Sequence, residues 1–161
     1  MKQDLFYSKV QERMKKGNLV LNGFLGEDKR NLVDIIDDDN EKVKRLGLTH
    51  EIIAEKLIEF KEIGLKGLEQ FVDYKDHFKI KVEIYRGKLP CPFGEKGIYQ
   101  KSEIIVINTK INEQIKYSDL SIHLIKEHGF YQGIGSPYRL DPEKLVKVLE
   151  IEVKENNKYL K

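Results

Sequence analysis

The chain has very little of several residue types, and each scarcity narrows its class. Cys91 is the only cysteine among 161 residues, so no disulfide can form within the chain. A single thiol favours a reducing compartment. No run approaches the roughly 18 apolar residues of a membrane span, and the first residues lack the apolar core of a signal peptide. We therefore expect a cytoplasmic protein with no membrane contact.

Charge and hydrophobic content indicate a folded domain with a densely charged surface. Charged residues make up 35% and hydrophobic residues 40% of the sequence, which suits a globular chain better than a disordered one. The net charge is only +2, and both signs alternate along the chain. Nucleic acid is therefore not the expected partner, because a dedicated binder usually carries a basic stripe or a more basic isoelectric point.

The first half of the chain reads as helical. Apolar residues recur at helical spacing in three segments, 3–16, 28–45 and 49–63, and glycines interrupt the pattern after each. Thr49 is expected to cap the third helix. Segment 18–26 is expected to be a strand or an extended connector. The inner face of the second helix is expected to be built from Leu32, Ile35, Ile36 and Val43.

Two motifs in this half are weak. The acidic run 37–41 resembles a calcium-binding loop, but Lys42 stands where the loop needs glycine. An exposed helical turn with Asp38 paired to Lys42 is the simpler interpretation. The segment 48–57 resembles the first helix of a helix-turn-helix, but Ile58 stands where such motifs turn through a glycine. DNA binding is kept only as a further alternative.

The second half predicts strands and two helices. Strict alternation predicts a strand over 77–86, and the apolar run 103–108 predicts a second strand buried on both faces. Segment 111–117 adds a third. A short helix is expected between Ser118 and Gly129, and a last helix from Asp141 to about Leu149.

Together these elements predict one α+β domain over 1–161, with a helical half packed against a small, mostly antiparallel sheet and two C-terminal helices. The helical half is expected to span about 1–68 and the sheet-containing half about 69–153. The charged tail 154–161 is expected to be frayed.

Cys91, His123 and His128 are the candidate metal ligands. A cysteine after a strand, followed by His-x4-His near the end of a helix, is similar to the order of a zinc finger over residues 78–129. The resemblance implies zinc as a cofactor. It is incomplete, because the partner cysteine is missing and the linker is long, although Glu95 offers a carboxylate.

Helix geometry gives a competing expectation for the two histidines. Positions five apart on a helix point about 140° away from each other, so one histidine is expected to be packed and the other exposed. The same residues also admit an enzyme, a thiol or metal-dependent hydrolase with Cys91 as nucleophile and His128 as base. The sequence does not decide whether any catalysis occurs.

The loop 130–139 is the candidate ligand-binding segment. Tyr131, Tyr138 and Arg139 would suit an anionic or ring-bearing ligand. The preferred interpretation is structural, with the aromatic residues anchoring the loop on the sheet and Arg139 bonding carbonyls. The stretches 87–94 and 128–133 resemble parts of bacterial cytoplasmic proteins to which no activity is attached.

The functional expectation is a non-catalytic domain that binds a small molecule or a protein partner. Its surface is expected to combine five residues, Cys91, His123, Tyr131, Tyr138 and Arg139. The hydrolase and the structural zinc site are the alternatives, and a homo-oligomer is left open.

Overall fold

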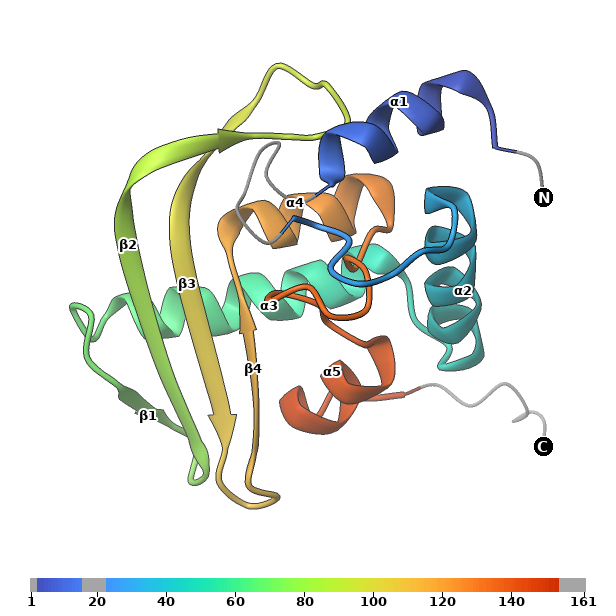
Figure 1. Cartoon of the computed structure of the whole chain (residues 1–161). Helices are drawn as coiled ribbons and strands as arrows, with labels where there is room; N and C mark the ends of the chain where they lie inside the picture. Colours follow the sequence, from blue (N-terminus) through green and yellow to red (C-terminus); the bar gives the residue numbers. More distant parts are fainter. Residues whose placement is uncertain (1–2, 16–22, 154–161) are drawn as a thin grey trace.

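The computed structural model describes residues 3–15 and 23–153. Over these residues the fold is α+β, with five helices and one antiparallel sheet, which confirms the predicted class. Figure 1 shows the helices gathered on one side of the sheet. Among the described residues, no helix is both long and apolar enough to cross a membrane.

The three N-terminal helices begin and end close to the predicted positions. They are α1 (Leu5–Met14), α2 (Leu32–Arg45) and α3 (His50–Leu65). The Thr49 side chain accepts a hydrogen bond from the Ile52 N–H, as expected of an N-cap. Gly64 was expected to interrupt α3 but lies inside it. Glycine is needed at this position, because a Cβ atom there would come within 2.6 Å of the Ile80 side chain. Its lack of a side chain lets α3 approach the sheet closely.

The sheet is a simple meander of four strands in the order β1-β2-β3-β4. The strands are β1 (Val72–Tyr74), β2 (Phe78–Pro90), β3 (Ile98–Asn108) and β4 (Glu113–Tyr117). β2 was expected to end near Arg86, but it continues through Gly87 with a shift in register between Ile84 and Lys88. A bulge of this kind bends a strand without ending its pairing.

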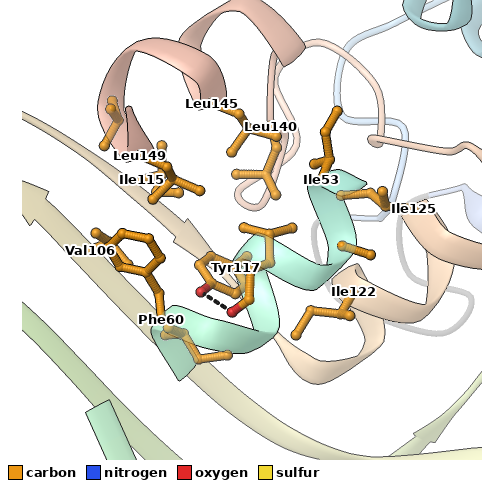
Figure 2. Packing of buried hydrophobic residues seen from close by; sticks show 14 of the residues in the cluster. Ile53, Phe60, Val106, Ile115, Tyr117, Ile122, Ile125, Leu140, Leu145 and Leu149 are labelled. Carbon is orange, nitrogen blue, oxygen red and sulfur yellow. Dashed lines mark hydrogen bonds between the residues drawn. The ribbon is translucent and has the colours of Figure 1, made fainter. Parts of the chain in front are cut away.

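One face of the sheet carries the core. β3 was expected to be buried on both faces, but its residues alternate between fully and partly buried, so this prediction is wrong. Helices α3, α4 (Asp119–His128) and α5 (Pro142–Leu149) pack against the buried face. Figure 2 shows this packing around Tyr117, which is fully buried and donates a hydrogen bond of 2.7 Å to the Leu57 carbonyl.

A second, smaller hydrophobic cluster lies beside the main one. It joins α1, the start of α2, the segment after β2 and one side of α4, and its members include Val10, Leu32, Cys91 and Phe93. Helix α4 contributes to both clusters, with Leu120 and Leu124 in the smaller one and Ile122 and Ile125 in the larger one. It thus fixes the segment containing Cys91 relative to the sheet.

Two other expectations can be compared with the structure. Residues 23–27 form turns, whereas the rest of the connector expected over 18–26 lies outside the described residues, as does the tail 154–161. Asp38 does not pair with Lys42 as expected; Asp38 pairs with Arg30, and Lys42 pairs with Asp141. The acidic run 37–41 is part of α2.

Candidate metal centre

Two segments bring four potential metal ligands together. Cys91 and Glu95 lie in the loop that follows β2, and His123 and His128 lie on α4. The loop folds tightly, since the Gly94 N–H donates to the Cys91 carbonyl at 3.0 Å and Gly94 has a φ of 91°, which favours glycine. Arg13 of α1 donates to the Pro92 carbonyl at 2.8 Å and holds the loop from the other side.

The local sequence defines both ends of the helix that supplies the histidines. The Ser118 side chain accepts from the Ser121 N–H in a capping box, and Gly129 closes the helix in the left-handed conformation. These two signals were read from the sequence, and they set which turn of the helix carries each imidazole.

The four ligand atoms all lie within 4.8 Å of one another. The His123 Nε2 and His128 Nε2 atoms lie 2.7 Å and 2.9 Å from the same Glu95 oxygen, Oε1. The Cys91 Sγ lies 3.8 Å from the His128 Nε2. We call these four residues the Cys91 cluster.

The two histidines therefore share a site, whereas helix geometry predicted one packed and one exposed. Their rings are 5.4 Å apart between centroids, and both side chains are largely enclosed, with 13% and 18% exposed. The angular argument considers only the direction in which each side chain leaves the helix. Helical side chains also lean toward the N-terminus, so the His128 ring can extend back toward His123, and the carboxylate of Glu95 reaches both.

Aromatic residues position each imidazole. The His128 ring stacks on Phe93 with centroids 3.9 Å apart and planes within 4°. The His123 ring stacks on Tyr99, and the Tyr99 hydroxyl lies 2.9 Å from the His123 Nδ1. A hydrogen bond at Nδ1 orients the opposite nitrogen, and this is how outer partners usually hold a metal-binding histidine.

The neighbouring groups shift the pKa values of Cys91 and Glu95 in opposite directions. Burial, together with the neighbouring Glu95 carboxylate, raises the pKa of the Cys91 thiol. Hydrogen bonds from His128 and His123 lower the pKa of Glu95. Without a cation, the cluster therefore favours a neutral thiol beside an ionised carboxylate.

The spacing of the ligand atoms is close to that of a tetrahedral metal site. Zinc binds nitrogen, oxygen and sulfur at about 2.0–2.3 Å, which places ligand atoms about 3.3–3.8 Å apart in a tetrahedron. The contacts of 2.7 and 2.9 Å are shorter than this range, the 3.8 Å contact lies at its upper end, and all four atoms lie within 4.8 Å of one another. The side chains would therefore have to move to accommodate the ion.

The arrangement is less suited to thiol catalysis. A catalytic base normally uses one ring nitrogen toward the nucleophile and the other toward an orienting group. Here Cys91 and Glu95 both face the Nε2 atom of His128, so Glu95 does not orient that ring for proton transfer. The catalytic role predicted for Cys91 and His128 stays a prediction.

The other candidate residues lie in different surroundings. Tyr131 is 1% exposed in the larger hydrophobic cluster, and its hydroxyl lies 2.8 Å from the His50 Nδ1. Tyr138 donates a hydrogen bond to Glu103. The structure thus brings Cys91 and His123 together but places Tyr131 inside the core, where it does not belong to a shared exposed surface.

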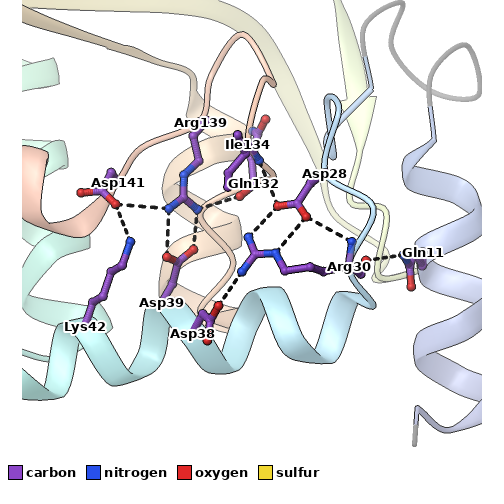
Figure 3. A network of polar contacts seen from close by, with 10 residues as sticks. All are labelled: Gln11, Asp28, Arg30, Asp38, Asp39, Lys42, Gln132, Ile134, Arg139 and Asp141. Atoms are coloured by element: carbon purple, nitrogen blue, oxygen red, sulfur yellow. Dashed lines mark hydrogen bonds and ion pairs between the residues drawn. The ribbon is translucent and has the colours of Figure 1, made fainter. Parts of the chain in front are cut away.

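Arg139 belongs to a network of ion pairs rather than to an open surface. Its guanidinium contacts both carboxylate oxygens of Asp39, which is 2% exposed, and also the Gln132 carbonyl. Figure 3 shows this arrangement continuing through neighbouring acidic and basic residues. We call it the arginine network; its charged members are Asp28, Arg30, Asp38, Asp39, Lys42, Arg139 and Asp141.

The sequence offers little indication of two residues, Glu95 in the Cys91 cluster and Tyr99 beside it. Glu95 was noted only as an available carboxylate, and Tyr99 was not considered. Tyr99 lies on the part of β3 that precedes the predicted strand, and a longer strand would have placed it opposite Leu89, two residues before Cys91. No local motif marks either residue as a partner of α4.

Comparison of the chain with protein-family models, curated proteins and solved structures finds no match. A function can therefore be inferred only from the chemistry of the site.

Proposed function

We propose that the chain is a zinc-binding protein in which Cys91, Glu95, His123 and His128 hold one ion. The observation that carries this proposal is the convergence of one sulfur, two imidazole nitrogens and one carboxylate oxygen within 4.8 Å. These atoms come from two segments separated by about thirty residues of chain, and each segment has its own turn or cap.

The donor set favours zinc over the common hard cations. Calcium and magnesium take oxygen ligands almost exclusively, whereas thiolate and imidazole suit zinc. A bound divalent cation would also reverse the local preference of Cys91, because a coordinating thiol loses its proton. The neutral thiol expected in the absence of a cation and the coordinating thiolate are thus two states of one site.

Four protein ligands support a structural role for the ion. Structural zinc sites are usually closed by four side chains, whereas catalytic sites keep one position for water. Such an ion would fasten the loop after β2 to the last turn of α4. Zinc would add a strong tie to the apolar packing of Cys91 and Phe93 in the smaller hydrophobic cluster.

The Cys/His hydrolase is the second candidate, supported by the 3.8 Å approach of the Cys91 Sγ to the His128 Nε2. The raised pKa of the thiol counts against it, because the thiolate is the nucleophile. Ligand or partner binding by the rest of the domain is compatible with a structural zinc site.

Metal content of the full chain purified without chelator tests the proposal. We expect one zinc per chain by elemental analysis, and loss of that zinc in Cys91→Ser and His123→Gln. Two variants serve as matched controls: His77→Gln, at a histidine paired with Glu150, and Glu127→Gln, at an exposed carboxylate on α4. Both should retain the metal. Absence of zinc from the wild-type chain after incubation with zinc and removal of the excess would exclude the proposal.

Binding should also stabilise the fold. At a free zinc concentration about 100 times the Kd, the free energy of unfolding should rise by about 2.7 kcal/mol. Denaturation with and without zinc measures this, and an identical midpoint in both conditions would mean that the ion does not bind the native state preferentially.

A further inference from the structure

A pocket of about 270 Å³ lies beside the segment that leads to Cys91. Its walls come from the bulged ends of β2 and β3, the beginning of α4, and the loop 132–138. The β2 residue Leu89 lines the pocket two positions before Cys91. The pocket is formed by different residues from the proposed zinc site.

The walls of the pocket are mainly apolar and aromatic. Two tyrosine rings and four apolar side chains line it: Tyr85, Tyr138, Phe24, Leu89, Leu120 and Pro137. The pocket is partly open to solvent, and its lining residue Tyr85 is exposed. Ligand sites in proteins are typically concave, mostly apolar and few in number.

Apart from the exposed Lys101, the polar side chains in the lining take part in hydrogen bonds within the protein. The Ser102 hydroxyl accepts from the Asp119 N–H, and the Ser136 hydroxyl donates to the Gln132 side chain. The Gln100 amide donates to backbone carbonyls of the β2 bulge. A charged ligand would therefore lose its hydration without gaining matching partners inside the pocket.

Charged groups of both signs lie near the rim. The Tyr138 hydroxyl donates to the Glu103 carboxylate at 3.0 Å, which places a negative charge beside the pocket. Lys101 lines the pocket but is exposed to solvent, where an ion pair contributes little, and the Lys116 Nζ lies 5.6 Å from the centre of the Tyr138 ring. Because charges of both signs are present, neither an anion nor a cation is favoured.

The volume sets the size of the occupant. A cavity of about 150 Å³ lined by apolar side chains holds benzene, so about 270 Å³ accommodates a molecule of one or two rings. We propose that this pocket binds a small, uncharged, ring-bearing molecule that contacts Tyr85 and Tyr138.

Of the two ligand classes considered from the sequence, this inference keeps the ring-bearing one and sets aside the anionic one. Tyr138 lies in the pocket, but Arg139 is held by Asp39 and Tyr131 lies in the core. The guanidinium that would have favoured an anion is thus already paired. The proposal does not depend on zinc.

An NMR titration of the full ¹⁵N-labelled chain tests the proposal with three probes of similar shape. Indole is uncharged, benzoate is an anion and benzylammonium is a cation. We expect saturable shifts with indole, centred on the amides of Tyr85, Gln100 and Tyr138, and much weaker effects from both ions. No saturable binding of indole, shifts centred elsewhere, or benzoate or benzylammonium binding as tightly as indole would each overturn it.

Substitution of Tyr138 separates contact with the ring from contact with the hydroxyl. Tyr138→Ala should weaken indole binding about tenfold, as expected for the loss of an aromatic contact, whereas Tyr138→Phe should bind nearly as well as the wild type. Tyr74→Ala is the matched control, because Tyr74 also donates to a carboxylate, that of Glu59, but lies outside the pocket. If Tyr138→Ala fails to fold, the comparison of the three probes on Tyr138→Phe still tests the proposal, and equal binding of all three would refute it.

Discussion

The Cys91 cluster and the arginine network are both partly buried polar groups, but their charges are balanced differently. In the arginine network each cationic group meets carboxylates, as when Arg139 contacts Asp39 and Arg30 contacts Asp28 and Asp38. In the Cys91 cluster the four groups are all electron-pair donors when deprotonated. The charges of the arginine network are thus paired within the protein. The donor atoms of the Cys91 cluster need either protons or a metal ion to balance them.

The difference explains why Arg139 does not offer an unpaired guanidinium to a ligand. A guanidinium in a loop suggests an anionic ligand, but here the anion is Asp39, on a helix one hundred residues earlier in the chain. A cationic side chain that is paired with a carboxylate of the same chain therefore indicates a structural role. A group of electron-pair donors without a cation among them indicates a site for a metal ion. The following predictions test this distinction.

The largest effect is expected from Arg139→Ala. Removal of one partner leaves the buried Asp39 carboxylate without its counter-charge, which typically costs about 3–5 kcal/mol. Urea denaturation should show this loss, and zinc content should be unchanged because Arg139 is not a ligand. A double variant, Asp39→Leu with Arg139→Met, should recover much of the stability. A loss below 1 kcal/mol in Arg139→Ala would mean that the network is not a structural element.

The next effect is expected from Cys91→Ser. Loss of the thiolate should weaken zinc binding by more than the roughly 100-fold that substitution of a supporting partner can cause. Competition with a chromophoric chelator measures the affinity, and His77→Gln provides the control. An affinity within tenfold of the wild type would show that the sulfur is not a ligand.

A smaller effect, dependent on pH, is expected from Asp28. The Arg30 side chain lowers its pKa to about 2, from an ordinary value of 3.8. Asp28 therefore stabilises the fold fully above pH 4, and this contribution is lost as the pH falls toward 2. Since Arg30 is about one-third exposed, the contribution is about 1–2 kcal/mol.

Asp28→Asn should remove that pH dependence. Denaturation of both proteins at pH 6 and near pH 2.5 should show a gap in stability at pH 6 that narrows in acid. A gap that stays constant over this range would contradict the role given to the ion pair.

The smallest effect is expected from Tyr99→Phe. The ring continues to stack on His123, but the hydroxyl that orients the Nδ1 atom is lost. Zinc affinity should fall about tenfold, the lower end of the effect of such partners. Phe93→Leu tests the corresponding role of stacking on His128. If neither variant changes the affinity, the aromatic residues do not position the imidazoles.

Local signals were sufficient to predict much of the fold. Thr49, Ser118 and Asp141 act as N-caps through their side chains, as predicted, because capping depends on residues only three positions away. The alternation in β2 predicted the buried residues Phe78, Ile80 and Val82, whereas Ile84, assigned to the same face, is exposed. What was missed depends on distant contacts: β1 forms only by pairing with β2, and β2 continues past Gly87 by pairing with β3.

The candidate site was predicted in part, for the same reason. The residue types at Cys91, His123 and His128 suggested metal binding, but angular reasoning on an isolated helix separated the two histidines. Their convergence depends on where the loop after β2 places Glu95, and that position is set by Arg13, Phe93 and Gly94 through contacts that have no local pattern.

X-ray absorption at the zinc edge of the zinc-loaded chain tests the central claim most directly. We predict one zinc per chain with one sulfur at about 2.3 Å and three nitrogen or oxygen ligands at about 2.0–2.1 Å. A wild-type spectrum with only nitrogen and oxygen neighbours, or a chain that binds no zinc, would contradict the claim that the Cys91 cluster is a metal site.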